Sequence, residues 1–366
     1  MNDTTSPCRW GILGAATIAR KNWQAIRRSG NGIIRAVASR DAARAEQWIS
    51  ENQADCPFAE RPVAVGGYDE LLARDDIDAV YIPLPTGLRK EWVIKAARAG
   101  KHVLSEKPCG AEAEDVEEMI AACREAGVQF MDGVMFMHSD RLPALRAVLD
   151  DGESVGQIRR LATQFSFLAD EDFLTGGNIR VHSDLEPLGC LGDLGWYNIR
   201  FALWMMKSEM PESVTGRTIS QTSEGVPTEF SGELIFATGP TVSFYCSFLT
   251  DHQEWAHISG TKGSIELRDF VIPFFGNETE FNLSRPEFTA IGCNFRVERH
   301  DTRMAVPEYS DSHETAPETK LFRRFADLVI SGQTDDYWPQ IALQTQQVMD
   351  ACLISARKGG EAVTLS

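Results

Sequence analysis

Two domains of different class are predicted by this sequence: an α/β domain with a parallel sheet, then an α+β domain with a large, open, mainly antiparallel sheet. The chain of 366 residues exceeds the length of one typical domain. Its first third alternates strand and helix patterns, as a parallel sheet with crossover helices requires. The second part carries longer β-rich runs, several without an intervening helix. Because the pattern changes near Gly133, we expect the domains to span residues 1–135 and 136–366.

The first domain opens with an apolar strand that runs into a turn of small residues and a helix. Its strands are expected at 9–13, 33–39, 78–82, 102–105 and 128–131. Its later helices are expected at 42–51, 88–99 and 113–126. This alternation predicts a Rossmann fold for the N-terminal domain.

The second domain is expected to form strands within 157–167, 230–237, 241–249 and 255–267. A Met- and Trp-rich segment, 196–206, is expected to be a helix beneath that sheet. Further helices are expected at 321–330 and 340–358, and the last can pack back on the first domain. Residues 301–320, rich in Pro, Glu and Ser/Thr, are expected to form a long surface loop. The sheet face without helices is free to pair with a second subunit.

Composition and charge exclude several classes of function. Acidic residues outnumber basic ones by 53 to 36, and the resulting formal charge of −17 repels nucleic acid and anionic membrane surfaces. No apolar stretch approaches the roughly 20 residues that span a bilayer, and the first six residues lack a secretory pattern, so a cytoplasmic location is expected. The eight cysteines and seven histidines show no metal-binding spacing. We therefore predict no metal.

The turn after the first strand predicts a dinucleotide site. Aligned to G-x-G-x-x-G, it reads Gly14-Ala15-Ala16-Thr17-Ile18-Ala19, so only the first glycine is present. Small residues at a helix N-terminus let backbone N–H groups approach a pyrophosphate closely. We expect cofactor contacts from Gly14, Ala15, Ala16, Thr17 and Ile18. A tight turn without a ligand is the alternative for this element alone.

Cofactor specificity is predicted from the end of the second strand. NAD-binding folds commonly carry an acidic residue there, whereas this chain has Ser39 followed by Arg40. A hydroxyl and a guanidinium suit the 2′-phosphate of NADP(H), so we predict NADP(H), with NAD(H) as a second possibility. Arg44 can add charge, or it can pair with Asp41 or Glu46 on the helix surface.

Three residues are candidates for the chemistry. Lys107 closes the strand pattern at 101–105, where a lysine can reach a bound nicotinamide. Asp193 and Tyr197 are four residues apart, so they share one helix face and can act on one substrate. A nearby ammonium favours the tyrosine phenolate, and Tyr197 would then exchange a proton with the substrate oxygen. Lys107 would stabilise the oxyanion and Asp193 would orient the pair. The alternative is a core tyrosine beside Trp196.

These motifs resemble the Gfo/Idh/MocA oxidoreductase family, and the resemblance covers most of the chain. It rests on the opening G-I-L-G-A-A-T-I-A, on A-G-K-H-V-L-S-E-K-P from Ala99 to Pro108, and on G-D-L-G-W-Y from Gly192 to Tyr197. The resemblance implies that Lys107 contacts the reacting hydroxyl or carbonyl and that Asp193 and Tyr197 supply proton transfer. Tyrosine, where many relatives carry histidine, resembles the branch with glucose–fructose oxidoreductase and dimeric dihydrodiol dehydrogenase. That branch favours NADP and sugars or diols.

The resemblance implies further site residues. Pro83, Leu84, Pro85 and Thr86 would form a loop over the nicotinamide half of the cofactor, with Glu106 and Lys107 beside it. The family's P-x-x-x-H motif ends here in Arg89, which leaves that contact open; Arg89 can also be a simple charge on the helix surface. Arg180 and His138 are candidates for substrate binding, although a buried histidine satisfied by backbone is common. Pairing through the open sheet would give a homodimer or homotetramer.

The leading functional hypothesis is an NADP(H)-dependent oxidoreductase that transfers hydride between nicotinamide and a sugar or polyol. One alternative is a dihydrodiol or carbonyl reductase with an aromatic-lined pocket. Another is a glycoside-processing enzyme that oxidises its sugar only transiently. A non-catalytic NADP-sensing or interaction protein is the alternative of another class, although a sensor does not require Lys107 and Tyr197.

Overall fold

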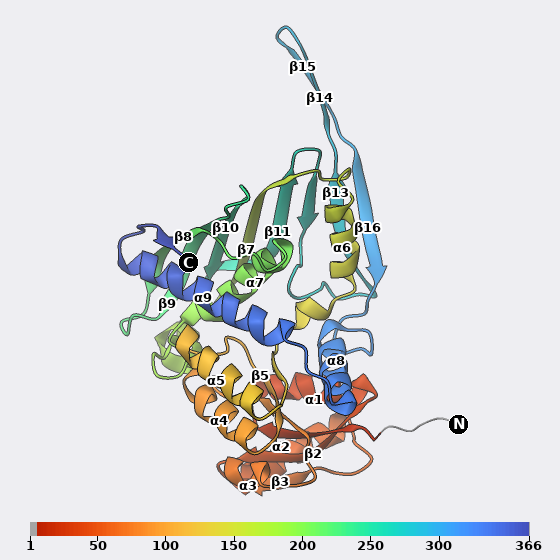
Figure 1. Ribbon diagram of the computed structural model, residues 1–366, viewed down its shortest axis with the longest axis vertical. Coiled ribbons are helices and arrows are strands. Elements are labelled where there is room, and N and C mark those ends of the chain that lie inside the picture. Colours follow the sequence, from red (N-terminus) through yellow and green to blue (C-terminus); the bar gives the residue numbers. More distant parts are fainter. Residues whose placement is uncertain (1–5, 366) are drawn as a thin grey trace, which may run out of the picture. The chain divides into compact units, whose positions relative to one another are not determined.

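The computed structural model describes residues 6–365, which form two compact units (Figure 1). The first unit contains the chain up to His138 together with His182–Pro187 and Asp311–Gln347. The second contains Ser139–Val181, Leu188–Ser310 and the residues from Val348 onward. Both units are therefore assembled from separate stretches of sequence. The first five residues, on which the expected lack of a secretory signal largely depends, lie outside the described part of the chain.

The first unit is built on a six-stranded parallel sheet with the order β3-β2-β1-β4-β5-β6. Its strands are β1 (Cys8–Leu13), β2 (Gly32–Ser39), β3 (Val63–Gly66), β4 (Ala79–Ile82), β5 (His102–Ser105) and β6 (Phe130–Asp132). Its helices are α1 (Thr17–Ser29), α2 (Ala42–Asp55), α3 (Tyr68–Leu72), α4 (Thr86–Arg98), α5 (Ala113–Glu125), the short η1 (Met135–His138) and α8 (Pro317–Ser331). The strand order reverses between β1 and β4, as in a Rossmann fold.

Helix α8 completes the core of this unit although it lies far along the chain. It packs beside α1 and against β1 (Figure 1). The rings of Phe322 and Phe325 both lie 5.3 Å from that of Trp10, and all three side chains are buried. The apolar positions at 3- and 4-residue spacing in α8 therefore face the sheet, as expected for an amphipathic helix.

The second unit is built on a nine-stranded sheet with the order β16-β13-β12-β11-β7-β10-β9-β8-β17. Only the pair β7 and β10 is parallel among its described strand pairs. Its strands are β7 (Ile158–Leu168), β8 (Ser213–Gln221), β9 (Pro227–Ile235), β10 (Thr241–Ser247), β11 (Leu249–Gly260), β12 (Ser264–Leu267), β13 (Glu278–Ser284), β16 (Asp301–Pro307) and β17 (Val363–Thr364). The other elements are α6 (Arg141–Asp150), η2 (Phe173–Gly177), η3 (Ile179–Val181), η4 (Leu191–Gly195) and α7 (Trp196–Met205). Helix α9 (Tyr337–Arg357) belongs to both units.

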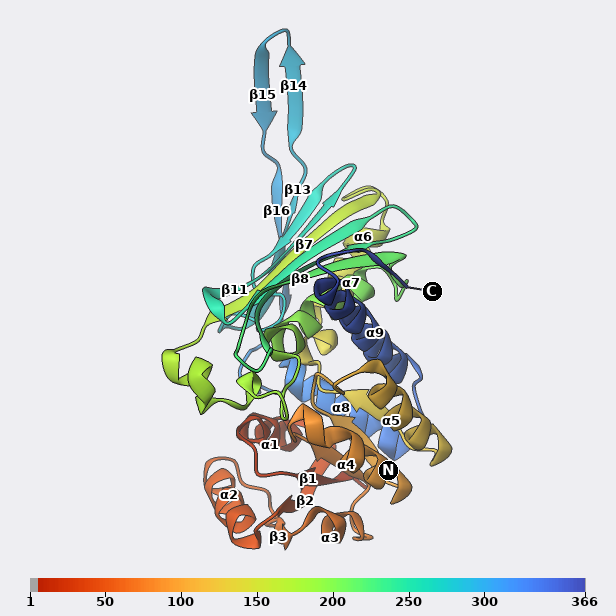
Figure 2. The same cartoon turned by 90° about the vertical axis from the view of Figure 1, so that its left-hand side faces the viewer.

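The two faces of this sheet differ in burial. In β10, Val242, Phe244 and Cys246 are buried, whereas the alternate residues Ser243 and Tyr245 are half-exposed. Helices α6 and α7 pack on the buried face, which Figure 2 shows on one side of the sheet. The end of α9 packs there too, against β8. A Cβ atom at Gly216 would lie 2.1 Å from the Cys352 carbonyl oxygen, so only glycine permits this approach.

The predicted fold class is confirmed: a parallel α/β domain precedes an α+β domain with a large, mainly antiparallel sheet. The predicted surface loop at 301–320 is wrong in its first and last parts. Residues Asp301–Pro307 form β16, which pairs with β13 at the edge of the sheet, and α8 begins at Pro317. The charged and Pro-containing composition that favoured a loop also suits an edge strand.

A hairpin that the sequence analysis did not anticipate joins β13 and β16. It consists of β14 (Glu287–Ile291) and β15 (Asn294–Glu298), and it extends away from the sheet of its unit (Figure 2). No helix of residues 6–365 is both long and apolar enough to cross a membrane.

Candidate active site

The candidate cofactor residues gather along the carboxyl edge of the parallel sheet. The turns that carry them follow β1, β2, β4 and β5, which are neighbours in the sheet. Open parallel sheets bind ligands outside the carboxyl ends of their strands, where the strand order reverses. Here that point lies between β1 and β4.

The turn after β1 fits a dinucleotide pyrophosphate. Gly14 has a φ of +126°, which a side-chain-bearing residue rarely adopts, and its N–H donates to the Ala38 carbonyl oxygen at 2.9 Å. Thr17 and Ile18 are exposed at the start of α1. The N-cap residue Ala16 offers no side-chain acceptor, so the first amides of α1 are left for a ligand.

The turn after β2 carries two guanidinium groups. Ser39 is buried, while Arg40 and Arg44 are exposed. Asp41 caps α2 through the Ala43 N–H, and Glu46 pairs with Arg61 at 2.6 Å, so the partners suggested for Arg44 are engaged elsewhere. Within residues 6–365, neither Arg40 nor Arg44 forms an ion pair.

Tyr68 joins this group at the start of α3. Burial raises the pKa of Tyr68, and the charges of Arg40 and Arg44 oppose that rise, so both arginines act on its hydroxyl. The same hydroxyl lies 3.9 Å from the position of a Cβ atom at Gly14. The turns after β1 and β2 therefore meet around the Tyr68 hydroxyl.

The turn after β4 is fixed by a buried side chain of the helix that follows it. Pro83, Leu84 and Thr86 are buried, and α4 begins at Thr86. Arg89, in the first turn of α4, is buried and donates from Nε to the Leu84 carbonyl oxygen at 2.6 Å. The interpretation of Arg89 as a charge on the helix surface is therefore wrong.

The turn after β5 places a lysine beside a buried carboxylate. Glu106 accepts hydrogen bonds from the Tyr81 hydroxyl at 2.6 Å and from the Lys107 N–H at 3.2 Å. The Asn22 amide donates to the Tyr81 hydroxyl at 2.5 Å. Burial and the Glu106 carboxylate raise the pKa of Tyr81 well above its usual value. Glu106 is thus engaged by the protein itself. The neighbouring Lys107 is half-buried.

In the second unit, Asp193 and Tyr197 occupy consecutive helical elements. Asp193 lies in η4 and Tyr197 in the first turn of α7. They are the two residues of 191–200 that are not buried. The stretch across the η4–α7 junction is therefore buried except for one half-buried carboxylate and one half-buried phenol, four residues apart.

The two predicted substrate residues have partners in their own units. The Arg180 Nε atom forms an ion pair with Asp193 at 2.8 Å, and the Arg180 N–H donates to the Asn178 side chain at 3.1 Å. His138 stacks on Trp338 with ring centroids 4.6 Å apart. Arg180 thus lies beside Asp193, whereas His138 packs with the start of α9.

An aromatic cluster continues from Tyr197 within the second unit. The Phe165 ring lies 5.6 Å from that of Tyr197. Nearby, the rings of Phe167, Phe173 and Phe248 lie 5.1 to 5.7 Å from one another. Phe165 and Phe248 are buried, whereas Phe167 and Phe173 are half-buried, so only the last two offer an apolar group a surface to pack on.

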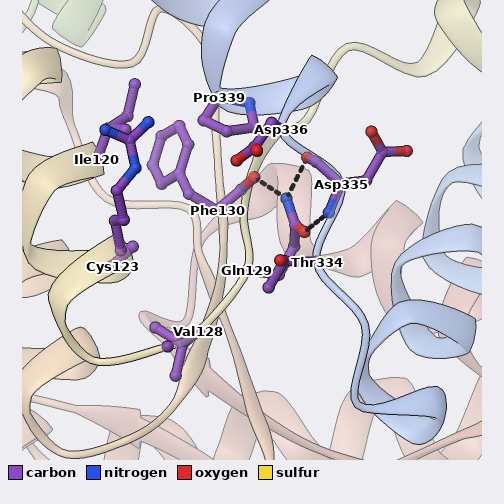
Figure 3. Close-up of a pocket in the computed structure, with 11 residues that line it drawn as sticks. Ile120, Cys123, Val128, Gln129, Phe130, Thr334, Asp335, Asp336 and Pro339 are labelled. Carbon is purple, nitrogen blue, oxygen red and sulfur yellow. Dashed lines mark hydrogen bonds between the residues drawn. The ribbon is translucent and has the colours of Figure 1, made fainter.

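A small pocket in the first unit lies away from these turns. It has a volume of about 90 Å³ and is lined by residues of α5, of the turn that leads into β6, and by Thr334, Asp335, Asp336 and Pro339 (Figure 3). The Gln129 side chain and the Asp335 backbone exchange hydrogen bonds of 3.2 and 2.7 Å across it. Gln129 stands at the amino end of β6, opposite the edge that binds dinucleotides, and none of the predicted site residues lines the pocket.

Among the described residues, one group has the composition of a metal site. Side-chain ligand atoms of Glu287, Glu298 and His300 lie within 4.8 Å of one another at the base of the β14–β15 hairpin. Arg296 already pairs with Glu298 at 2.7 Å. These residues lie outside both sets of candidate catalytic residues.

The fold and the turns at its carboxyl edge define a dinucleotide-dependent oxidoreductase. Residues 8–134 match the family model described as "Oxidoreductase family, NAD-binding Rossmann fold". Residues 143–266 match the model of the GFO/IDH/MocA C-terminal domain. The chain belongs to the GFO/IDH/MocA oxidoreductase family, and the predictions of family and enzyme class are confirmed.

Curated relatives include a dTDP-3,4-didehydro-2,6-dideoxy-alpha-D-glucose 3-reductase of Streptomyces violaceoruber. It is 34% identical over 78% of this chain and 80% of its own. A trans-1,2-dihydrobenzene-1,2-diol dehydrogenase of Mus musculus is 32% identical over 76% of this chain and 79% of its own. Among solved structures, the 3-ketoreductase KijD10 of Actinomadura kijaniata in complex with NADP and TDP-benzene has a TM-score of 0.80 and 27% identity. That match covers 96% of this chain and 98% of the other.

Sequence reasoning missed Tyr68 and Glu186. Tyr68 had a usable signal, because it follows a short strand pattern and so stands at the carboxyl edge of the sheet. Glu186 had none: its partner Thr86 is one hundred residues away in sequence.

Proposed function

We propose that this protein is an NADP(H)-dependent oxidoreductase that interconverts a hydroxyl and a carbonyl group of a sugar or polyol. The observation that carries the proposal is the half-buried pair Asp193 and Tyr197 in an otherwise buried stretch. A half-buried carboxylate and a half-buried phenol four residues apart are suited to proton transfer. Family membership supports the role of Lys107 on the same substrate.

Tyr197, Lys107 and Asp193 have different parts in the proposed reaction. NADP(H), when bound, supplies or accepts the hydride. Tyr197 gives the proton of its hydroxyl to the substrate oxygen in reduction and takes it back in oxidation. The Lys107 ammonium stabilises negative charge on that oxygen. Asp193, held by Arg180 at 2.8 Å, orients the phenol or binds a neighbouring hydroxyl.

The proposed preference for NADP(H) depends on the turn after β2. Arg40 and Arg44 supply two cations without ion-pair partners among the described residues, and Ser39 and Tyr68 supply hydroxyl donors. Guanidinium groups and hydroxyls recognise a phosphate, and none of these four residues is an acid that would bind a free ribose. The glycine-dependent turn at Gly14 accommodates the pyrophosphate of either cofactor.

The cofactor proposal is tested by titrating the protein with NADPH and with NADH. Arg40→Ala should weaken NADPH binding about tenfold or more, the worth of a charge-assisted hydrogen bond, and leave NADH binding unchanged. Arg61→Ala, which removes an arginine paired with Glu46, is the matched control. A wild-type preference for NADH would contradict the role of Arg40.

The catalytic proposal is tested with a dTDP-linked keto sugar, free aldoses and a trans-dihydrodiol as substrates. Tyr197→Phe keeps the ring beside Phe165 but removes the proton donor, so kcat should fall by about 10²–10⁴-fold. Lys107→Met should have an effect of similar size, while NADPH binding persists in both variants. Full activity of Tyr197→Phe on the preferred substrate would overturn the assignment.

A dihydrodiol or carbonyl reductase is the second candidate, because the half-buried rings of Phe167 and Phe173 suit an aromatic substrate. Turnover of the dihydrodiol, but of no sugar, would favour it. Transient oxidation would release a glycoside product without net change of NADP(H). Binding of NADPH without chemistry on any substrate would favour the non-catalytic alternative.

A further inference from the structure

Arg89 is a buried cation in the first turn of α4, with an exposed fraction of 4%. Its Nε donates to the Leu84 carbonyl oxygen at 2.6 Å, and its Nη1 donates to the Pro108 carbonyl oxygen and to the Thr86 hydroxyl. Burying a guanidinium costs free energy unless its N–H groups find acceptors, and these three hydrogen bonds offset that cost.

Glu186 is the anionic partner of Arg89 in the same unit. It is 9% exposed, and its Oε1 atom lies 3.8 Å from Nη2 of Arg89. The Thr86 hydroxyl donates to Oε2 at 2.5 Å, and the Thr86 N–H donates to Oε1 at 3.1 Å. Since the N-cap residue Pro85 has no acceptor side chain, Glu186 caps α4 from a distant part of the sequence.

The pair therefore connects three segments of the first unit. Through Leu84 and Thr86 it fixes the turn after β4, and through Pro108 it fixes the turn after β5 that carries Lys107. Through Glu186 it holds His182–Pro187, where the Gly87 N–H also donates to the Leu185 carbonyl oxygen at 3.1 Å. Strands β4 and β5 are neighbours, so their turns lie next to each other at the carboxyl edge.

We propose that Arg89 is a positioning residue: by binding the carbonyl groups of Leu84 and Pro108, it sets the nicotinamide-side turn and Lys107 relative to each other. The family's P-x-x-x-H motif would place a histidine at this position, and here the arginine guanidinium occupies it. It binds two carbonyls and a hydroxyl at once from two nitrogens of its planar fork, whereas a lysine would have to reach all three acceptors from a single nitrogen. This inference rests on the proposed function of Lys107 and of the Pro83–Thr86 turn.

Ligand binding tests the proposal without turnover. NADP⁺ uses the nicotinamide-side turn, whereas 2′-phospho-ADP-ribose lacks the nicotinamide. In Arg89→Met, NADP⁺ affinity should fall about tenfold, and the affinity for 2′-phospho-ADP-ribose should stay within about twofold of the wild type. Lys90→Met removes the neighbouring cation, which pairs with Glu118 at the surface, and should leave both affinities unchanged.

A double variant separates positioning from stability. Arg89→Met leaves the Glu186 carboxylate buried without its cation, so the melting temperature should fall. Arg89→Met/Glu186→Gln removes that buried charge and should recover stability, yet NADP⁺ affinity and kcat should stay low because both carbonyls remain unbound. Arg89→Lys retains a cation beside Glu186 and provides a folded protein if Arg89→Met fails to fold. It should also show the selective loss of NADP⁺ affinity.

Recovery of NADP⁺ affinity together with stability in the double variant would overturn the proposal and leave Arg89 a purely structural role. Equal losses for NADP⁺ and 2′-phospho-ADP-ribose would overturn it as well, because the effect would then not be confined to the nicotinamide side. If the wild type binds NADP⁺ but converts no sugar or diol, the proposed function fails, and the comparison of the two ligands still decides the role of Arg89.

Discussion

Buried carboxylates in this protein differ in how they are compensated. Glu106 accepts hydrogen bonds from Tyr81 and from the Lys107 N–H, and Glu186 has two donors from Thr86 and a nearby guanidinium. Glu254, in β11, is 3% exposed; it accepts from the Ile272 N–H at 2.7 Å and lies 3.3 Å from the His252 ring, but the Asp269 carboxylate adds a like charge near it. Burial and this like charge both oppose the ionisation of Glu254.

Glu254 should make stability depend on pH. Burial and the Asp269 charge raise its pKa to about 8, against the opposing effects of the Ile272 N–H and Arg141. Because the pKa is higher in the folded state, the stabilising contribution is complete below about pH 4.5 and is lost as the pH rises through about 8.

Glu254→Gln keeps an acceptor for Ile272 and a donor toward His252 but cannot ionise. At about 1.4 kcal/mol per pKa unit, the wild type should lose a few kcal/mol relative to this variant between about pH 5 and pH 8. Urea denaturation across this range measures the difference. Glu266→Gln, an exposed glutamate of the same sheet, is the control and should parallel the wild type. Parallel curves for Glu254→Gln and the wild type would contradict the raised pKa.

The sequence could predict residues whose chemistry is local. Lys107 follows its strand directly, and Asp193 and Tyr197 are four residues apart, so a short motif predicts each position. The sequence could not predict the partners that fix the site's side chains and turns. Arg180 of η3 pairs with Asp193 of η4, and Glu186 binds Thr86, which is one hundred residues away in sequence. Such contacts depend on the folded backbone and leave no spacing in the sequence.

At the scale of elements, α8 shows how a late segment can complete an early domain. The helix was predicted from its own periodicity, but its place beside α1 was not, since nothing in a local pattern relates Phe325 to Trp10. The β14–β15 hairpin was not predicted. Nearly all of its strand residues are exposed, so burial does not require either face of the hairpin to be apolar.

Phe325→Ala should destabilise the first unit by about 3–5 kcal/mol, because a fully buried ring is removed from contact with Trp10. Denaturation followed by tryptophan fluorescence measures this change. Phe295→Ala is the matched control: its ring stacks on Phe288 in the hairpin but is 71% exposed, so the loss should be about 1 kcal/mol or less. Equal losses in the two variants would show that α8 contributes little to the core.

At the scale of the whole molecule, one face of the nine-stranded sheet is left open, because α6 and α7 pack on the other face. Its central positions are half-exposed or exposed, and they include Ala162, Gln164, Ser243, Tyr245, Trp255 and His257. Family resemblance implies a homodimer or homotetramer through this face, and we propose that arrangement. The formal charge of −17 on each copy opposes association, so pairing should strengthen as salt screens the repulsion.

Ala162→Arg tests this proposal at the centre of the sheet. Ala162 lies on β7 between Ser243 of β10 and His257 of β11, so an arginine there would place a long charged side chain in the middle of the contact. We expect light scattering to show a dimer or tetramer for the wild type and a shift toward monomer for the variant. Ala73→Arg, at an exposed position of the first unit, should leave the wild-type mass unchanged.

NADPH binding should persist in Ala162→Arg, because the cofactor residues belong to the first unit and this variant alters the sheet of the second. A wild-type protein that is monomeric at both low and high salt would contradict the proposed pairing. An oligomer that withstands Ala162→Arg would instead place the interface elsewhere. The exposed hairpin is then the next surface to change, through Phe288 and Phe295.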